Sequence, residues 1–181
     1  MLANSRRVRD SSSASTHACA LGSVGVMAYV AVVGPDTGPR SPEDLLEQAR
    51  DVGRLLAAAG AIVVCGGLGG VMQAVSEGVA ERGGSSVGML PGRERTGANA
   101  SLSIALPTGL GEARNWLVIC ASDVVIAIGE GYGTLSEIAL ALRSGRHVVG
   151  LDTWTIADDD PQMHVAASAA DAVAQALRLA D

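Results

Sequence analysis

Short runs of consecutive apolar residues alternate along the chain with longer segments whose apolar residues recur every three or four positions. The short runs are rich in valine and isoleucine, as is typical of strands buried on both faces of a parallel sheet. Seven runs predict strands, the last of them a short edge strand: 29–33, 61–65, 87–90, 104–107, 124–128, 147–151 and 162–166. Regular strand–helix alternation implies parallel pairing with right-handed crossovers. The sequence therefore predicts an α/β fold, a three-layer Rossmann-like sandwich around a mainly parallel sheet of six to seven strands.

Helices are predicted between these strands, and two of them carry clear start signals. Ser41 is placed at the N-cap of the first, with Pro42 at its first helical position, and this helix ends near Gly60. Ser168, followed three residues later by Asp171, is expected to cap the last helix. The remaining helices are predicted over residues 71–82, 110–121 and 134–143.

The first 26 residues differ in composition from the rest. Three arginines precede a serine-rich stretch, and no apolar periodicity appears there. A secretory signal would place an apolar segment directly after the basic residues, so we expect none and predict a cytoplasmic protein. Residues 18–33 are apolar but too short and too interrupted by glycine for a membrane span. We expect residues 1–26 to be a disordered tail or an upstream-start extension, and residues 27–181 to form one domain.

Composition excludes several classes of function. All 13 basic residues are arginine, so a pyridoxal phosphate enzyme and a Walker phosphate loop, which both need a lysine, are excluded. The formal charge of −6 and the lack of a basic stripe in the folded part argue against a nucleic-acid partner. The three cysteines and three histidines lack the spacing of metal ligands, so we expect no metal site.

Two glycine clusters directly follow predicted strands and open predicted helices. One follows strand 61–65; the other begins the segment 129–137, Gly-Glu-Gly-Tyr-Gly-Thr-Leu-Ser-Glu. At such junctions, backbone N–H groups and a helix N-terminus face an anion, and in a parallel sheet both junctions lie at one edge. The sequence therefore predicts a phosphorylated small-molecule ligand. The candidate binding residues are Gly66, Gly67, Gly69, Gly70, Gly131, Tyr132, Gly133 and Thr134.

The topology brings Arg114 and Glu137 to this edge as neighbours, and a carboxylate beside an anion-binding loop points to chemistry or specificity at the bound phosphate. An arginine there can bind phosphate or position the carboxylate. Two structural alternatives remain open. Glu137 can form a capping box with Thr134 as the helix N-cap, and Arg114 can form a surface ion pair with Glu112.

Two residues of the second glycine turn raise separate questions. Tyr132 either packs over the mouth of the ligand site or is simply an exposed loop residue. Glu130 is unexpected in a phosphate-cradling turn, because a carboxylate repels a dianion. We expect the Glu130 side chain to point to solvent or to pair with Arg93 or Arg95.

The segment 129–137 resembles the signature of the LOG (Lonely Guy) superfamily, once labelled lysine decarboxylase-like. The family motif Pro-Gly-Gly-x-Gly-Thr-x-x-Glu matches it in register, with Gly129 and Glu130 replacing the proline and the first glycine. Arg114 lies nine residues before Asp123, the spacing at which the family has its catalytic arginine.

The resemblance extends to one branch of this superfamily. Asn115 stands where the family has a lysine, and the run 108–115 together with 131–137 resembles small proteins grouped with molybdenum cofactor carriers.

The resemblance implies two possible functions. LOG enzymes hydrolyse a nucleoside 5′-monophosphate to free base and ribose 5-phosphate, which would make Glu137 and Arg114 the working pair. The carrier branch implies a non-catalytic carrier or sensor of molybdenum cofactor or another phosphorylated pterin or nucleotide. No cofactor is required in either case, and a nucleotide or molybdenum cofactor would be the bound ligand. The resemblance also implies a homodimer or homotetramer, for which segments 116–119 and 138–142 are the expected interface.

Overall fold

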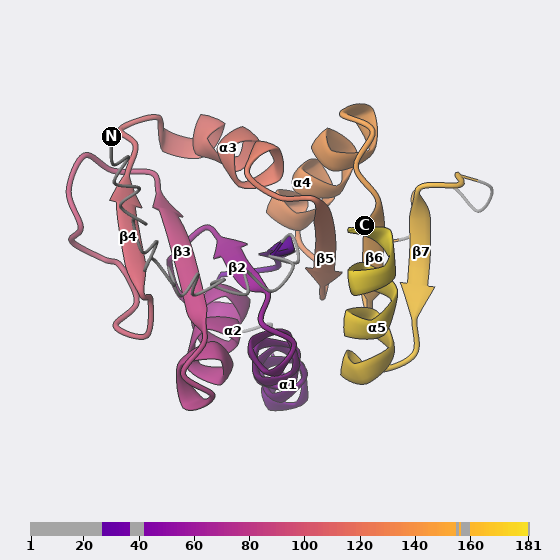
Figure 1. Cartoon of the computed structure of the whole chain (residues 1–181). Coiled ribbons are helices and arrows are strands. Elements are labelled where there is room, and N and C mark those ends of the chain that lie inside the picture. The colour runs from indigo at the N-terminus through magenta and orange to yellow at the C-terminus, as the bar shows by residue number, and fades with distance from the viewer. Residues whose placement is uncertain (1–26, 37–41, 155, 157–159, 181) are drawn as a thin grey trace, which may run out of the picture.

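The computed structural model describes residues 27–36, 42–154, 156 and 160–180, so the predicted tail 1–26 and Ser41 lie outside the described residues. A parallel sheet of seven strands forms its centre, in the order β4-β3-β2-β1-β5-β6-β7 (Figure 1). The strands are β1 (Tyr29–Val33), β2 (Ile62–Cys65), β3 (Ser85–Leu90), β4 (Ile104–Pro107), β5 (Val124–Ile128), β6 (Val148–Leu151) and β7 (Met163–Ala166). Each matches a predicted apolar run.

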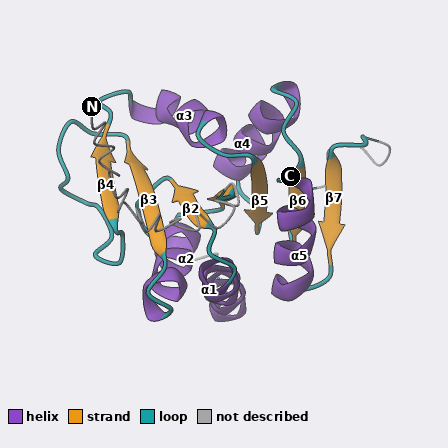
Figure 2. Cartoon of the chain, viewed as in Figure 1, coloured by secondary structure: helices purple, strands orange, loops and turns teal. Residues whose placement is uncertain are grey.

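Helices cover both faces of this sheet and make three layers, as predicted (Figure 2). Helices α1, α2 and α5 pack on one face, and α3 and α4 on the other. Side chains of β1 alternate between the two cores: Val30 and Val32 face the first, Ala31 and Val33 the second. The helical elements are α1 (Glu43–Ala58), α2 (Gly70–Glu81), the 3₁₀ turn η1 (Gly111–Arg114), α3 (Asn115–Cys120), α4 (Tyr132–Arg143) and α5 (Ala169–Leu179).

Three predicted helices differ from those in the structure. Pro42 occupies the N-cap of α1 rather than its first helical position. The helix predicted over 110–121 is split into η1 and α3. Helix α4 begins at Tyr132, because Gly131 takes the extended backbone of an N-cap two residues earlier than expected. The predicted cap of α5 is confirmed: the Asp171 N–H donates to Ser168 Oγ at 3.2 Å.

Helices α1 and α2 approach each other closely through two glycines. A Cβ on Gly53 would lie 2.2 Å from the carbonyl oxygen of Val75, and a Cβ on Gly78 would lie 2.0 Å from that of Arg50. Beside this contact, Arg50 pairs with Glu77 at 3.0 Å across the two helices. Only glycine therefore permits the observed helix spacing at these two positions.

None of the helices in the described part of the chain is both long and apolar enough to cross a bilayer.

We expect Gly78→Ala to lower the free energy of unfolding by about 1–3 kcal/mol, the usual cost of forcing extra volume into a packed contact. Urea unfolding measures the change. Gly92→Ala is the matched control, because a Cβ at Gly92 would meet nothing closer than 3.9 Å. Equal stability of Gly78→Ala and the native chain would contradict the close helix contact.

Candidate functional site

The edge formed by the carboxyl ends of the strands carries a crevice at the junction of β1 and β5. These strands are neighbours, but β1 leads to α1 on one face and β5 leads to α4 on the other. Open α/β sheets bind ligands where the strand order reverses in this way. Two pockets lie here, on either side of the loop 129–131, and among the described residues only Gly131 lines both.

The first, which we name the arginine pocket, has a volume of about 390 Å³. It draws residues from the loops after β1, β2, β3 and β5, so the two glycine-rich junctions lie at one edge, as predicted. Its lining consists of Gly34, Pro35, Asp36, Leu68, Met72, Pro91, Glu112, Arg114, Asn115, Gly131, Gly133, Thr134 and Glu137.

Arg114 ends η1 and is held in the interior of this pocket, with only 7% of its surface exposed. Its Nη1 donates to Asn115 Oδ1 and lies 3.8 Å from Glu137 Oε1, whereas its buried Nε has no partner among the described residues. Gly66 makes room for the guanidinium, because a Cβ there would lie 2.5 Å from Arg114 Nη2. The surface ion pair with Glu112 is therefore not found.

Thr134 is the third residue of α4 and is 1% exposed. Its Oγ1 is buried and has no hydrogen-bond partner in the described part of the chain. The first N–H groups of a helix lack partners within the helix, so Gly133 and Thr134 belong to the turn that can hold an anion. Because Thr134 is not the N-cap, the capping box with Glu137 is wrong.

Glu137 lies one turn further along α4 and is 7% exposed. Burial raises the pKa of its carboxyl to about 7, with Glu112 adding to the rise and Arg114 opposing it. At neutral pH this group therefore exists in both protonation states, and its protonated form can donate a hydrogen bond to a ligand oxygen.

The other glycine cluster lies behind the arginine pocket. Gly66, Gly67, Gly69 and Gly70 are absent from the lining of that pocket, while Leu68 and Met72 from the same segment contribute to it. Gly67 has a φ of +74°, and a Cβ on it would lie 3.0 Å from Gly88 Cα. The structure thus gives Gly66 and Gly67 packing roles, whereas Gly131, Gly133 and Thr134 of the turn after β5 line the pocket.

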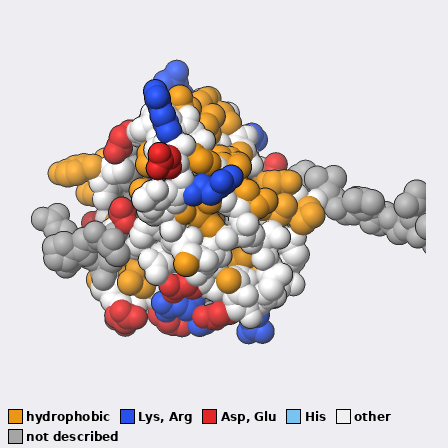
Figure 3. Space-filling model, turned by 90° about the vertical axis from the view of Figure 1, so that its left-hand side faces the viewer, with side chains coloured by type: hydrophobic (Ala, Val, Ile, Leu, Met, Phe, Trp, Pro, Cys, Tyr) orange, Lys and Arg blue, Asp and Glu red, His pale blue; other side chains and the backbone are white. Residues whose placement is uncertain are grey.

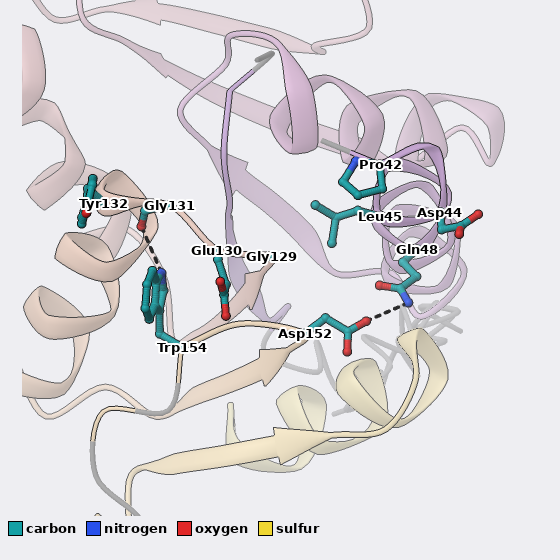
Figure 4. Close-up of a pocket in the computed structure, with 10 residues that line it drawn as sticks. All are labelled: Pro42, Asp44, Leu45, Gln48, Gly129, Glu130, Gly131, Tyr132, Asp152 and Trp154. Carbon is teal, nitrogen blue, oxygen red and sulfur yellow. Dashed lines mark hydrogen bonds between the residues drawn. The ribbon is translucent and has the colours of Figure 1, made fainter. Parts of the chain in front are cut away.

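The second pocket, which we name the tryptophan pocket, has a volume of about 630 Å³ and lies on the other side of the loop 129–131 (Figure 4). The sequence predictions missed it, although the switch-point rule applied to β6 would have drawn attention to the residues that follow that strand. Its lining consists of Pro42, Asp44, Leu45, Gln48, Gly129, Glu130, Gly131, Tyr132, Asp152 and Trp154.

Glu130 belongs to the tryptophan pocket and is not part of the arginine pocket. The expected repulsion of a phosphate is thereby reduced, because the carboxylate lies across the loop. The pairing of Glu130 with Arg93 or Arg95 is not found: Arg95 Nε donates to the Ala105 carbonyl at 3.2 Å, and Arg93 packs against Gly109. Tyr132 is 87% exposed and lies apart from the other side chains (Figure 4).

We expect Glu137→Gln to stabilise the fold more at high pH than at low pH. A carboxyl whose pKa rises on folding contributes stability below its unfolded pKa, 4.5, and loses it as the pH rises to about 7. Because glutamine mimics the protonated acid, its advantage should grow from below about 1 kcal/mol at pH 5 to about 3 kcal/mol at pH 8. Urea unfolding at both values tests this, and a pH-independent difference would contradict it.

Comparisons with known proteins agree with this geometry. The molybdenum cofactor binding protein of the phototrophic bacterium Rippkaea orientalis is 31% identical, with a TM-score of 0.79 over 86% of this chain and 98% of that one. The molybdenum cofactor carrier protein of Chlamydomonas reinhardtii is 35% identical, with a TM-score of 0.78 over 84% of this chain and 98% of that one.

Sequence comparisons identify a relative and a family for this chain. A protein of Archaeoglobus fulgidus is 42% identical over 109 residues, which are 60% of this chain and 72% of that protein. The model of the SLOG cluster4 family matches residues 27–178. The match spans all seven strands and both pockets, and the chain belongs to the SLOG cluster4 family.

Proposed function

We propose that this protein binds a phosphorylated small molecule, pterin-like or nucleotide-like, in the arginine pocket and carries it without converting it. Molybdenum cofactor is one ligand of this kind. The observation that carries the proposal is a pair of buried polar atoms, Arg114 Nε and Thr134 Oγ1, which have no partner among the described residues and belong to one pocket at the start of α4. A buried polar atom without a partner costs about 1–3 kcal/mol, and phosphate oxygens would satisfy both atoms.

The arginine pocket offers one cation to an anionic ligand. Among the described residues of its lining Arg114 is the only basic one, beside the carboxyl groups of Asp36, Glu112 and Glu137, and a guanidinium can donate two parallel hydrogen bonds to a phosphate. The turn 131–134 adds a helix N-terminus. Glu137 contributes in its protonated form, because a protonated carboxyl does not repel the phosphate and can donate a hydrogen bond to it.

The names of the two molybdenum cofactor proteins favour carriage over turnover for this chain. Asn115 supports the same reading. Its Oδ1 accepts a hydrogen bond from Arg114, so this position orients the guanidinium instead of adding the second positive charge of the LOG lysine.

Hydrolysis of a nucleoside 5′-monophosphate is the second candidate function. The observation that favours it is the pKa of Glu137, which burial raises to about 7, the range in which an acid–base catalyst works at neutral pH. In that reaction water attacks the anomeric carbon, the bond to the base breaks, and ribose 5-phosphate and free base leave.

We expect Arg114→Met to weaken binding of guanosine 5′-monophosphate by about 10- to 100-fold, because a hydrogen bond to a charged group contributes about 1.5–3 kcal/mol. Titration calorimetry measures the change. Arg143→Met is the matched control, since Arg143 is exposed in the last turn of α4, the helix whose first turn lines the pocket. Equal loss in both variants, or no loss in either, would contradict a specific phosphate contact at Arg114.

We also propose that the chain forms a homodimer or homotetramer, through a surface smaller than the two segments predicted for it. Val118, Ile119, Ile138 and Ala141 are fully buried in the core and cannot contact a second copy. Trp116 is 43% exposed, and Figure 3, which views the β4 side, shows hydrophobic side chains gathered on its upper half, where α3 lies. Exposed apolar area of this kind is typical of an interface.

We expect light scattering to give two or four times the chain mass of 18.2 kDa, and Trp116→Glu to reduce it to one chain, because a buried unpaired carboxylate destabilises an apolar interface. Val165→Glu is the control, since Val165 is exposed on β7, the opposite edge of the sheet. A monomeric native chain would contradict the proposed assembly.

A further inference from the structure

The tryptophan pocket has the size and composition of a small-molecule site, and it differs from the arginine pocket in that no arginine stands among its described lining residues. Its volume of about 630 Å³ lies within the usual range for ligand pockets. Asp44, Glu130 and Asp152 give its lining three carboxylates, and none of the described residues that line it is basic. It therefore disfavours anions and favours groups that donate hydrogen bonds.

One wall of this pocket is fixed by two hydrogen bonds to the loop 129–131. Trp154 Nε1 donates to the Gly131 carbonyl at 3.2 Å, and Thr153 Oγ1 donates to the Gly129 carbonyl at 2.5 Å. Figure 4 shows the Trp154 ring standing beside Glu130 with its N–H directed to Gly131. The indole is thus held in place by its polar edge, which leaves its π-face for contact with a planar ring.

The opposite wall carries an amide whose orientation is set by a neighbouring carboxylate. Gln48 Nε2 donates to Asp152 Oδ2 at 3.0 Å, so Oε1 is turned towards the pocket, as Figure 4 shows. That oxygen is buried and has no partner among the described residues. Asp152 holds this position with a φ of 49°, a conformation that aspartate tolerates better than most residues. Gln48 Oε1 is therefore a hydrogen-bond acceptor that a ligand donor can satisfy.

Glu130 provides a second acceptor. Within the described part of the chain it forms no ion pair and accepts no hydrogen bond, so both carboxylate oxygens are available. A carboxylate with two available oxygens can accept two parallel N–H bonds. The 2-amino-4-oxo-pyrimidine edge, shared by pterins and guanine, offers such a pair in its ring N–H and exocyclic NH₂. The corresponding edge of adenine offers a ring-nitrogen acceptor instead, which a carboxylate repels.

We propose that the tryptophan pocket binds the 2-amino-4-oxo-pyrimidine ring of the ligand, with Glu130 accepting its N–H pair, Gln48 Oε1 accepting a further donor, and Trp154 contacting its face. This inference rests on the proposed function in one respect, that the same ligand carries a phosphate. Gly131 lines both pockets. The loop 129–131 thus separates a site for the anionic end of the ligand from a site for its ring.

Fluorescence of Trp154 tests the proposal directly. The variant Trp116→Phe leaves Trp154 as the only tryptophan of the chain. In this background we expect guanosine and neopterin to quench the emission saturably and adenosine to bind at least tenfold more weakly. Adding Glu130→Gln should weaken guanosine and neopterin at least tenfold, whereas Glu94→Gln, at an exposed loop residue outside both pockets, should leave them unchanged.

The comparison of guanosine with guanosine 5′-monophosphate separates the two proposals. Guanosine has no phosphate, so it reports on the tryptophan pocket alone. Binding of the monophosphate without binding of guanosine, or equal binding of adenosine, would overturn the ring assignment and leave phosphate binding at Arg114 intact. Binding of guanosine and of its monophosphate with equal affinity would support the ring site and count against the phosphate site. Preference for neopterin over guanosine would identify a pterin as the ring, and the reverse preference a guanine nucleotide.

Discussion

The site depends on a positive charge that is almost fully withdrawn from water. Arg114 is 7% exposed, and its nearest carboxylate, Glu137, is 3.8 Å away and equally buried. Burial raises the pKa of Glu137 to about 7, so the carboxyl neutralises the guanidinium only in part near neutral pH. A buried charge is stable only when it is compensated and hydrogen-bonded. The incomplete compensation of Arg114 is the physical basis of the anion that we propose for this pocket.

The loop after β5 turns that local requirement into an organised site. Gly129 has a φ of +72°, and a Cβ there would lie 2.7 Å from a methyl carbon of Leu45. This glycine lets the chain turn tightly from the buried strand β5 into α4. The turn places Thr134 on the side of Arg114 and Glu130 on the side of Trp154. Residues 129–131 therefore separate a pocket that contains Arg114 from one whose described lining contains no basic residue.

Much of the fold could be predicted from local sequence patterns, namely apolar runs and helix-capping residues. Runs such as 124–128 are apolar throughout because both sheet faces are covered, and the Ser168–Asp171 cap uses only adjacent residues. The start of α4 was misplaced because Thr134 looks like a cap, whereas the extended backbone of Gly131 begins the helix earlier. The close approach of α1 and α2 at Gly53 and Gly78 depends on how the two helices pack, and no local pattern encodes it.

The two pockets also differ in how far the sequence predicts them. Arg114 and Glu137 could be paired from the sequence, because each follows a strand whose carboxyl end lies at a known edge. The tryptophan pocket joins Gln48 of α1 to Asp152 after β6, residues 104 positions apart in the chain. Their proximity depends on the order in which β1, β5 and β6 pair, which the strand patterns alone do not specify.

The most direct test of carriage against turnover is chromatography of guanosine 5′-monophosphate after incubation with the native chain, beside Glu137→Gln. Carriage predicts that the nucleotide is recovered intact from both proteins while calorimetry shows that the native chain binds it. Release of free base by the native chain, abolished in Glu137→Gln, would contradict carriage and make this protein a phosphoribohydrolase.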